Sequence, residues 1–342
     1  MATRSQGGSG FDARLLTVFM PAEESVMASA TITFGCSLNQ AEPHHIAEFA
    51  QRAEALGYDR LVAGEHVQDG NPPIPRILSL PVLAAAAAAT RQVRVMSGIV
   101  IAPLYHPVML AKLVATVDRI ANGRLDFGIG ISGQRSTRIE YDILNVPVET
   151  RGRRTNEMLP LLRRLWTEQH VTHKGELYQF EDATLLPQPV QKPCPPIWIA
   201  GRSDAAMKRA ATLGDGWYPY LFSVRRLKES NETIRSQAQA AGRDLADFRF
   251  GVAQPTSISE DRSEALAVAV KNLGKYATAQ RSAEDVAKAL CLTGTVSDCI
   301  KGIQDRIDAG VRHINLAFLA KDEQDAYRQM ELVATQVIPS FR

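Results

Sequence analysis

The sequence has few cysteines and no excess of charge of either sign. Its four cysteines are scattered over 342 residues and form no CxxC pair, which argues against a zinc ribbon, a thioredoxin-like site or a disulfide framework. Lysine and arginine number 39 against 37 aspartates and glutamates, for a formal net charge of +2. That balance gives no reason to expect nucleic acid or an acidic membrane surface as a partner. We therefore expect a cytoplasmic protein that binds a small organic ligand.

Long hydrophobic runs are also missing. No apolar run approaches the roughly 20 residues that cross a bilayer, since even the alanine tract 84–89 is flanked by Pro81 and Arg91. We therefore expect neither a membrane span nor an export signal. Regular patterning begins only near residue 31, after a polar Ser/Gly-rich start and a short apolar run. We interpret 1–30 as an N-terminal extension that is disordered or artificially added, and 31–342 as a single domain.

Motifs for chemistry by side chains alone are absent as well. The seven histidines show no HxxxH or HxH spacing, so no metal centre is predicted. A GxSxG elbow, a Walker loop, an HExxH motif and paired catalytic carboxylates are missing too. We therefore expect an organic cofactor to supply the chemistry.

What is present is a regular alternation of short apolar runs with amphipathic helical stretches, which is typical of βα units around a parallel sheet. In the first unit a strand is followed by a helix that begins at Pro43 and ends at Gly57. About eight such strands are expected, the number that closes a (β/α)₈ TIM barrel. An open doubly wound sheet is the structural alternative. The expected strands cover 32–38, 60–63, 93–101, 125–131, 196–200, 216–220, 248–253 and 313–318.

Two stretches do not fit the repeat. Residues 173–189 read as a β-turn excursion before the fifth strand, and 278–295 read as a helical insertion before the last unit. Insertions on barrel enzymes commonly cover the ligand-binding mouth. We expect both insertions to do so here.

The active site of a parallel barrel lies where strands end and βα loops begin. The residues at these positions are rich in glycine and polar groups. We predict His66 and Glu65 as catalytic residues, because an imidazole can move a proton near neutral pH. The cofactor is predicted to contact Asn39, Ser97, Gly98, Gly128, Gly130, Ser132, Gly133, Gly201, Arg202, Ser203 and Trp217.

Each of these signals also has a purely structural interpretation. Residues 201–203 run from a strand into a helix start, where free amides and a guanidinium suit a phosphate, but an ordinary capped βα turn has the same residues. The glycines within 128–133 allow a planar ligand to approach the backbone, but tight strand packing also requires glycine. A lone histidine such as His66 is more often structural.

Several stretches resemble the bacterial luciferase-like superfamily of flavin- and deazaflavin-dependent oxidoreductases. Each stretch alone is modest, but their order and spacing are specific, and together they span about 31–318. The matching stretches are AEALGYD (53–59), GEHV (64–67), HPVMLAK (106–112), DRIANGRL (118–125), RGRR (151–154), PPIWIAGRS (195–203) and LGDGW (213–217).

The resemblance implies a (β/α)₈ barrel with insertions, a reduced flavin-type cofactor at the carboxyl mouth, and a homodimer. Carried over by position, 201–203 hold the phosphate, 128–133 and 97–98 line the ring, and 65–66 face the reaction centre. In relatives the third strand often carries a bulge or a cis peptide under the ring. We expect that feature at 97–98.

The resemblance leaves two cofactors open. Deazaflavin-using relatives tend to have tryptophan after the fourth strand, where Ser132-Gly133-Gln134 stands here, whereas Gly64-Glu65-His66 with 151–154 points toward the deazaflavin subgroup. We predict a two-component monooxygenase in which reduced FMN, delivered by a separate flavin reductase, reacts with oxygen near 97–98 and oxidises a small organic substrate. The first alternative is hydride transfer from reduced coenzyme F420 to a ketone, alkene or imine. The second is a barrel that binds a flavin without catalysis.

Overall fold

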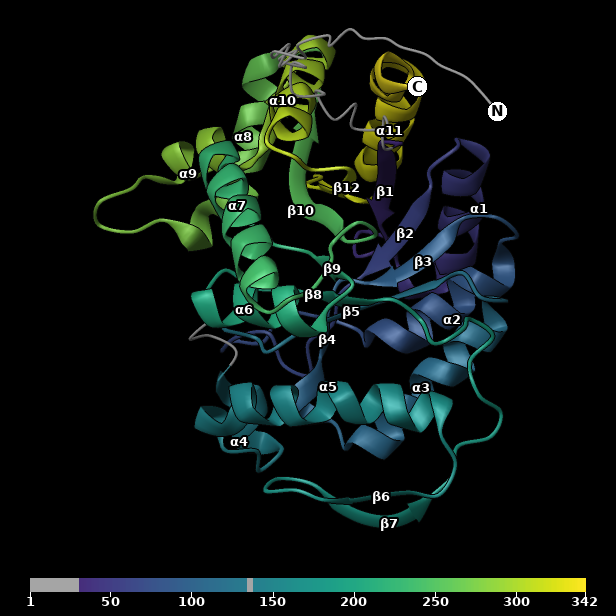
Figure 1. The fold of residues 1–342 in the computed structure, drawn as a ribbon. Helices are drawn as coiled ribbons and strands as arrows, with labels where there is room; N and C mark the ends of the chain where they lie inside the picture. The colour runs from purple at the N-terminus through teal and green to yellow at the C-terminus, as the bar shows by residue number, and fades with distance from the viewer. Residues whose placement is uncertain (1–30, 134–137) are drawn as a thin grey trace, which may run out of the picture. The chain divides into compact units, whose positions relative to one another are not determined.

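The structure, a computed structural model, describes residues 31–133 and 138–342 (Figure 1). The extension predicted over 1–30 lies outside the described residues, as does Gln134. Eight parallel strands form a closed ring in which each strand pairs with two neighbours. The predicted (β/α)₈ barrel is confirmed, and the alternative of an open sheet is wrong. In order around the ring, the strands are β1 (Thr33–Ser37), β2 (Arg60–Ala63), β3 (Arg94–Ser97), β5 (Leu125–Gly130), β8 (Ile197–Ile199), β9 (Gly216–Trp217), β10 (Arg249–Ile258) and β12 (His313–Phe318).

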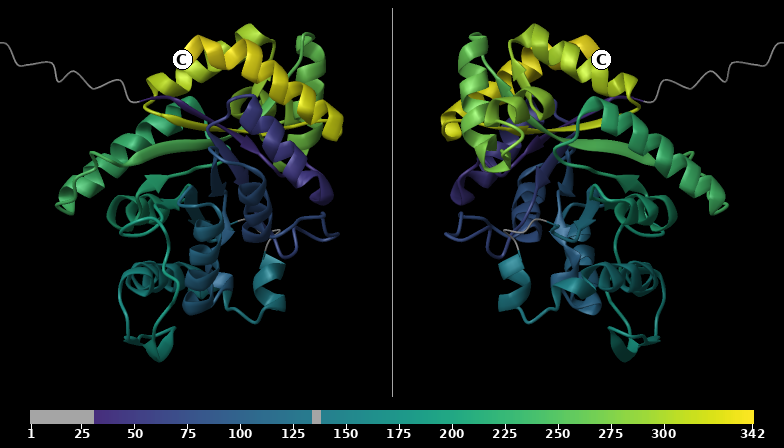
Figure 2. Two further views of the ribbon diagram at one scale, coloured as in Figure 1. Left: turned by 90° about the vertical axis from the view of Figure 1, so that its right-hand side faces the viewer. Right: turned by 90° about the vertical axis from the view of Figure 1, so that its left-hand side faces the viewer.

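Helices follow the strands and pack on the outside of the barrel (Figure 2). The first, α1 (Ile46–Ala55), buries Ile46, Phe49, Ala50 and Ala53, which recur at helical spacing along one face. The other α-helices are α2 (Ser79–Ala89), α3 (Pro107–Ile120), α4 (Arg138–Ile143), α5 (Arg151–Thr167), α6 (Asp204–Leu213), α7 (Val224–Ala240), α8 (Arg262–Leu273), α9 (Ala283–Leu290), α10 (Val296–Asp308) and α11 (Glu323–Leu332). Short turns of other helix types are η1 (Pro43–His45), η2 (Ala102–Leu104), η4 (Val148–Thr150), η5 (Gly274–Tyr276), η6 (Val333–Val337) and η7 (Ile338–Phe341).

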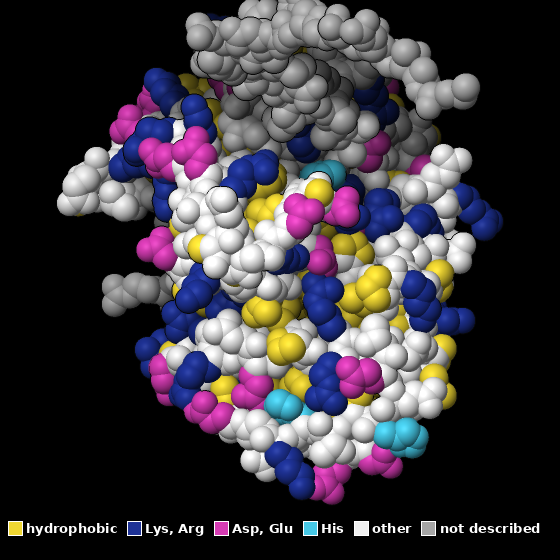
Figure 3. Space-filling model, in the orientation of Figure 1, with side chains coloured by type: hydrophobic (Ala, Val, Ile, Leu, Met, Phe, Trp, Pro, Cys, Tyr) yellow, Lys and Arg dark blue, Asp and Glu magenta, His cyan; other side chains and the backbone are white. Residues whose placement is uncertain are grey.

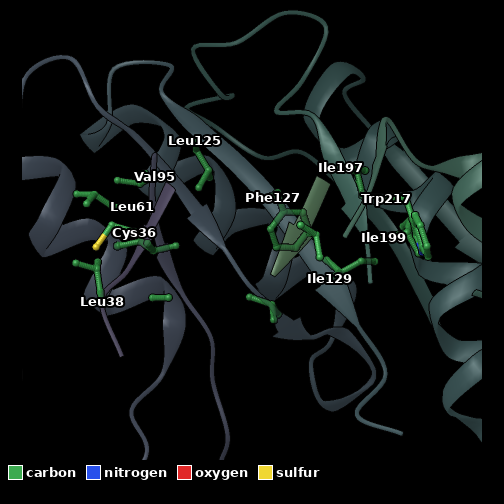
Figure 4. Close-up of a cluster of buried hydrophobic side chains, with 14 of the residues drawn as sticks. Cys36, Leu38, Leu61, Val95, Leu125, Phe127, Ile129, Ile197, Ile199 and Trp217 are labelled. Atoms are coloured by element: carbon green, nitrogen blue, oxygen red, sulfur yellow. The ribbon is translucent and has the colours of Figure 1, made fainter. Parts of the chain in front are cut away.

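Successive side chains along each strand point alternately to the outside and the inside of the barrel, so there are two separate apolar regions. Outward-facing side chains such as Phe127, Ile197 and Trp217 are fully buried in the main core (Figure 4). Inward-facing side chains form a smaller cluster inside the barrel, which includes Trp198 and Tyr218. This period of two is what parallel strands covered by helices require.

The third strand is interrupted where the sequence predicts one continuous strand over 93–101. β3 ends at Ser97, and a short strand β4 (Val100–Ile101) follows, with a cis peptide bond between Gly98 and Ile99. Both segments pair with β5, and the register shifts by one residue between them. The expected irregularity is therefore present, one peptide beyond the predicted 97–98.

The serine at the end of β3 replaces the missing backbone pairing. The Ser97 hydroxyl donates to Gly128 O, and Gly128 N donates to Ser97 Oγ, each over 2.8 Å. A Cβ atom on Gly128 would lie 2.0 Å from Ser97 O. The structural interpretation of tight strand packing therefore holds for Gly128.

Replacing Gly128 with alanine is expected to destabilise the protein by about 1–3 kcal/mol, because the clash is with backbone rather than with a movable side chain. The measurement is the free energy of unfolding in urea. Gly274→Ala is the matched control, since a Cβ atom there meets nothing within 4 Å. Equal stability of the two variants would contradict this account.

The first insertion does not lie over the mouth, contrary to the prediction. Strands β6 (Val171–Lys174) and β7 (Gln179–Ala183) form an antiparallel hairpin on the outer side of α5 (Figure 1). His173 Nε2 lies 2.9 Å from Glu157 Oε1 on that helix, and Tyr178 N donates to the same oxygen. The hairpin is held there because its polar groups form hydrogen bonds with the Glu157 carboxylate.

The second insertion does lie on the mouth side. A further strand, β11 (Leu292–Gly294), pairs with the carboxyl end of β10. Just before the insertion, Lys275 Nζ lies 3.8 Å from Asp69 Oδ2 in the loop after β2, and the rings of Tyr276 and Tyr220 are 6.5 Å apart. These contacts join three loops at the carboxyl end of the barrel.

The opposite end of the barrel carries a buried ionic cluster. Asp126 is fully buried and accepts hydrogen bonds from Arg60 (2.9 Å), Arg94 (2.9 and 3.0 Å) and Arg249 (3.2 Å). Each arginine is the first residue of its strand. The three guanidinium groups hold the pKa of Asp126 well below its usual range despite burial, which by itself would raise it. We call this set the floor cluster.

The described surface has mixed charge. Lysine and arginine side chains are interspersed with aspartate and glutamate on the face shown in Figure 3. Among the described helices, none is both long and apolar enough to cross a membrane.

Candidate functional site

The carboxyl ends of the first three strands meet at the mouth of the barrel. Asn39 Oδ1 accepts a hydrogen bond from Gly64 N over 3.2 Å, which joins the ends of β1 and β2. A Cβ atom on Gly64 would lie 2.7 Å from Gly98 O, so only glycine allows this approach of β2 to the irregular peptide after β3. The structure thus brings the predicted Asn39 and Gly98 together, with Gly64 between them.

Glu65 follows Gly64 but does not face the mouth. Its side chain is buried, and its two carboxylate oxygens accept hydrogen bonds from Ile101 N (3.0 Å), Tyr105 Oη (3.1 Å) and Ser79 N (3.2 Å). Burial raises the pKa of this carboxyl group. The prediction that Glu65 faces the reaction centre is therefore corrected: the side chain fastens the start of α2 to β4.

His66 is oriented by a carboxylate that the sequence analysis missed. Its Nδ1 lies 2.9 Å from Glu140 Oε1, and Val67 N donates to Glu140 Oε2 over 2.6 Å. The Glu140 side chain is fully buried, whereas that of His66 is 23% exposed. A carboxylate at Nδ1 fixes the ring and leaves Nε2 for a ligand or a proton.

Glu140 lies on α4, a short helix that joins two loops of the mouth. Beside the His66 contact, the Tyr141 hydroxyl donates to Ile131 O at the end of β5 over 2.6 Å. Burial raises the pKa of Tyr141, which keeps the hydroxyl a donor. Sequence reasoning could not find this pair because 74 residues separate His66 from Glu140 and no motif spacing links them.

At the end of β5 the predicted glycines differ in their surroundings. A Cβ atom on Gly130 would lie 2.9 Å from the Ile99 side chain, so this glycine, like Gly128, serves strand packing. A Cβ atom on Gly133 would meet none of the described residues within 4 Å. Ser132, with φ of 46°, makes the turn between them. Of these positions, Gly133 has the room that a planar ligand needs.

The end of β8 forms a helix terminus with cationic side chains. Gly201 has φ of +131° and leads into α6, where the Ser203 side chain accepts a hydrogen bond from Ala206 N. Arg202 is exposed beside this terminus, and Arg226 Nη2 donates to Arg202 O over 3.4 Å. Free amides and the Arg226 guanidinium therefore lie at the start of α6, next to the loop that carries Arg202, and this arrangement is suited to an anion. Arg226 was missed because it lies on the next helix.

The Trp217 side chain points to the outside of the barrel, whereas the sequence predicts a contact with the cofactor. Its side chain is fully buried in the outer core, and its indole N–H donates to Gly201 O over 3.1 Å. The neighbouring Tyr218 faces the barrel interior instead, with its ring about 3.1 Å from the position of a Cβ atom on Gly98. Burial raises the pKa of Tyr218 to about 12, so its hydroxyl stays protonated. Trp217 supports the Gly201 loop rather than the mouth.

A metal centre has no support in the described part of the chain, where no group of three or more histidine, cysteine, aspartate or glutamate side chains could hold an ion. The mouth instead offers a histidine–carboxylate pair, a buried phenol and an anion-binding helix terminus. A (β/α)₈ barrel with such groups at its carboxyl end belongs to the class of barrel enzymes that bind an organic ligand at the mouth.

Comparisons with known proteins identify the family. Residues 16–313 match the sequence model of the luciferase-like monooxygenases, so the chain belongs to this family of flavin- or F420-dependent oxidoreductases and is an enzyme. This rules against the alternative of a barrel without catalysis. The resemblance noted from the sequence is thereby confirmed.

Individual relatives divide between the two cofactors. The oxygenase component of a flavin-dependent trigonelline monooxygenase from Acinetobacter baylyi is 39% identical over 132 residues, which is 39% of this chain and only 36% of that protein. An F420-dependent glucose-6-phosphate dehydrogenase from Nakamurella multipartita is 27% identical over 348 residues, covering 92% of this chain and 98% of the other. The solved structure of an F420-dependent secondary alcohol dehydrogenase with an F420-acetone adduct has a TM-score of 0.79 at 22% identity, covering 91% of this chain and 99% of the other.

Proposed function

We propose that this protein is the oxygenase component of a two-component monooxygenase that uses reduced FMN and oxygen on a small organic substrate. A separate flavin reductase would supply the reduced flavin. The observation that carries the proposal is the start of α6, where the Arg226 guanidinium donates to Arg202 O and the Arg202 side chain is exposed. Relatives with this activity, such as the trigonelline monooxygenase component, support the reaction class.

The charge at the α6 terminus favours FMN over F420. The phosphate of FMN is a terminal monoester with close to two negative charges at neutral pH, and two guanidinium groups at a helix start complement that charge. The phosphate of F420 is a diester with one charge. Gly201, whose backbone conformation disfavours a side chain, allows the loop to turn its amides toward such a group.

The other residues would bind the ring and manage protons. FMN supplies the electrons that activate oxygen. Gly133 would provide space for a planar ring, and the protonated Tyr218 hydroxyl, in the barrel interior beside Gly98, would donate a hydrogen bond to it. His66, held by Glu140, presents Nε2 to a proton donor or acceptor at the mouth.

Hydride transfer from reduced F420 is the second candidate, because the longer alignment is with an F420-dependent dehydrogenase that covers 92% of this chain. A binding titration of FMN and F420, in oxidised and reduced forms, separates the two candidates. Our proposal requires tighter binding of reduced FMN and oxygen consumption when the protein, reduced FMN and candidate substrates are mixed. Tight binding of F420 with no affinity for FMN would overturn it.

Replacing Arg202 with glutamine is expected to weaken FMN binding about tenfold or more, since a charge-assisted hydrogen bond to phosphate contributes roughly 1.5–3 kcal/mol. Arg226→Gln should have an effect in the same direction. Riboflavin, which lacks the phosphate, is the matched probe, and its affinity should not change in either variant. Equal loss of riboflavin and FMN binding would show that these arginines do not contact the phosphate. Fluorescence quenching measures both affinities.

We also propose a homodimer formed through α2 and α3. On α3, Met109, Leu113 and Ile120 are exposed by 59%, 36% and 44%, and the neighbouring α2 is apolar around its whole circumference. Exposed apolar surface of this kind is typical of protein interfaces.

The double substitution Met109→Glu and Leu113→Glu is expected to convert a dimer into a monomer. Light scattering after size exclusion measures the mass. Ile143→Glu on α4 is the matched control, because it adds a charge at an apolar position with 49% exposure away from α3. A wild-type monomer, or a dimer that tolerates the double change, would contradict this interface.

A further inference from the structure

A cavity of about 450 Å³ lies outside the barrel, between β11 and the helices α8, α9 and α10. Its lining includes part of the second insertion, over 288–293, but none of the predicted cofactor-binding residues. Its apolar walls include Leu266, Ala289 and Leu292, and its polar lining includes Thr293 and Arg306. These last two side chains indicate a ligand.

Arg306 is a buried cation that forms no ion pair in the described structure, although the Asp305 carboxylate on the same lining favours its charged form. Its residue is 4% exposed, its Nε donates to Gln254 Oε1 over 2.5 Å, and its Nη1 donates to Gly302 O over 2.7 Å. Within the described residues it forms no ion pair and its Nη2 makes no hydrogen bond. Burial lowers the pKa of Arg306 to about 10, which still leaves it charged at neutral pH. Buried charges are normally paired because desolvation is costly.

A second buried polar group on the cavity lacks a partner. Thr293 Oγ1 is inaccessible to solvent and makes no hydrogen bond in the described structure. Gly302, which lines the same cavity, has no room for a side chain, because a Cβ atom there would lie 2.5 Å from Leu292. An unpaired hydroxyl and an unpaired guanidinium on one cavity call for an acceptor that carries negative charge.

The other charged side chains on the cavity limit how much negative charge a ligand can carry. Asp298 pairs with Arg262, and Lys288 pairs with Glu284, so these groups are already compensated. Asp305 adds a further negative charge on the lining. One unpaired cation beside carboxylates suits a monoanion better than a dianion such as phosphate.

We propose that this cavity binds a small organic monocarboxylate, with the carboxylate between Arg306 and Thr293 and the hydrocarbon part against Leu266 and Leu292. The ligand neutralises Arg306 and satisfies the Thr293 hydroxyl. The site is separate from the mouth and does not depend on which redox cofactor the enzyme uses.

Benzoate tests the proposal against its neutral isostere benzamide, at constant ionic strength and without flavin. The expected result is saturable calorimetric binding of benzoate with a rise in Tm, and no comparable binding of benzamide. Equal binding of the two probes, or no saturable binding of benzoate, would overturn the proposal. Tighter binding of inorganic phosphate than of benzoate would also overturn it, because the site would then prefer a dianion.

Two variants locate the binding. Arg306→Met is expected to weaken benzoate binding at least about tenfold and to lower the Tm of the unliganded protein, because the Gln254 and Gly302 oxygens lose their donor. Thr293→Val is expected to weaken binding in the same direction. Arg225→Gln, which removes an exposed arginine paired with Glu229, is the charge-matched control and should bind normally. Unchanged benzoate affinity in Arg306→Met would place the ligand elsewhere and refute the site.

Discussion

Replacing His66 with alanine is expected to lower kcat by about 10²-fold or more, the usual contribution of a positioned acid–base group. The imidazole lies at the end of β2, its side chain is partly exposed, and its Nδ1 is fixed by Glu140, which leaves Nε2 as the reactive nitrogen. Turnover should be measured with whichever reduced cofactor the titration selects. Cofactor affinity should change little, because the proposed phosphate site is at α6.

Glu140→Gln tests whether the carboxylate acts through His66. We expect a 10- to 100-fold loss of kcat with little change in KM, the range seen when a group that orients a functional histidine is removed. The double variant should be no slower than His66→Ala alone, because both changes remove one function. Additive losses would show that Glu140 acts independently, and full activity of His66→Ala would remove the histidine from the mechanism.

Asp126→Asn is expected to destabilise the fold by about 3–5 kcal/mol, the usual result of breaking a buried ion pair. The change leaves three guanidinium groups, on Arg60, Arg94 and Arg249, without their shared carboxylate. The free energy of unfolding in urea measures the effect. Glu229→Gln removes one partner of an exposed pair with Arg225 and should cost less than about 1 kcal/mol. Equal costs would contradict a stabilising floor cluster.

The same carboxylate gives the stability a defined pH dependence. Because the folded-state pKa of Asp126 is depressed, its contribution is fully present above the unfolded value of about 3.9. It is lost progressively as pH falls below that value toward the folded pKa. The difference in stability between the wild type and Asp126→Asn should therefore shrink in acid and stay constant between about pH 6 and 8.

The barrel could be predicted from the sequence because its signals are local. Each strand is a short apolar run and each helix has its own period, so the eight strands of the ring fall at the predicted places. What failed was side-chain direction in the shortest strand, β9, where two residues do not define an alternation and Trp217 was assigned to the interior in place of Tyr218. The hairpin over 171–183 was misplaced because composition does not tell which surface an insertion packs on.

The site was only partly predictable for a related reason. Position at a strand end placed Asn39, His66 and Gly98 at the mouth, where the structure has them, since the barrel gathers all strand ends there. Strand-end position could not distinguish His66 from Glu65, whose carboxylate accepts hydrogen bonds from backbone amides. Nor could it find Glu140 or Arg226, which come from helices and depend on tertiary packing.

The floor cluster and the mouth lie at opposite ends of the same strands, which separates the groups that maintain the fold from those that would handle a ligand. Loops at the carboxyl ends can therefore be randomised in a selection for new substrates while Asp126 and its arginines remain untouched. Such libraries should retain most of their folded members. The scaffold is thus a favourable starting point for directed evolution.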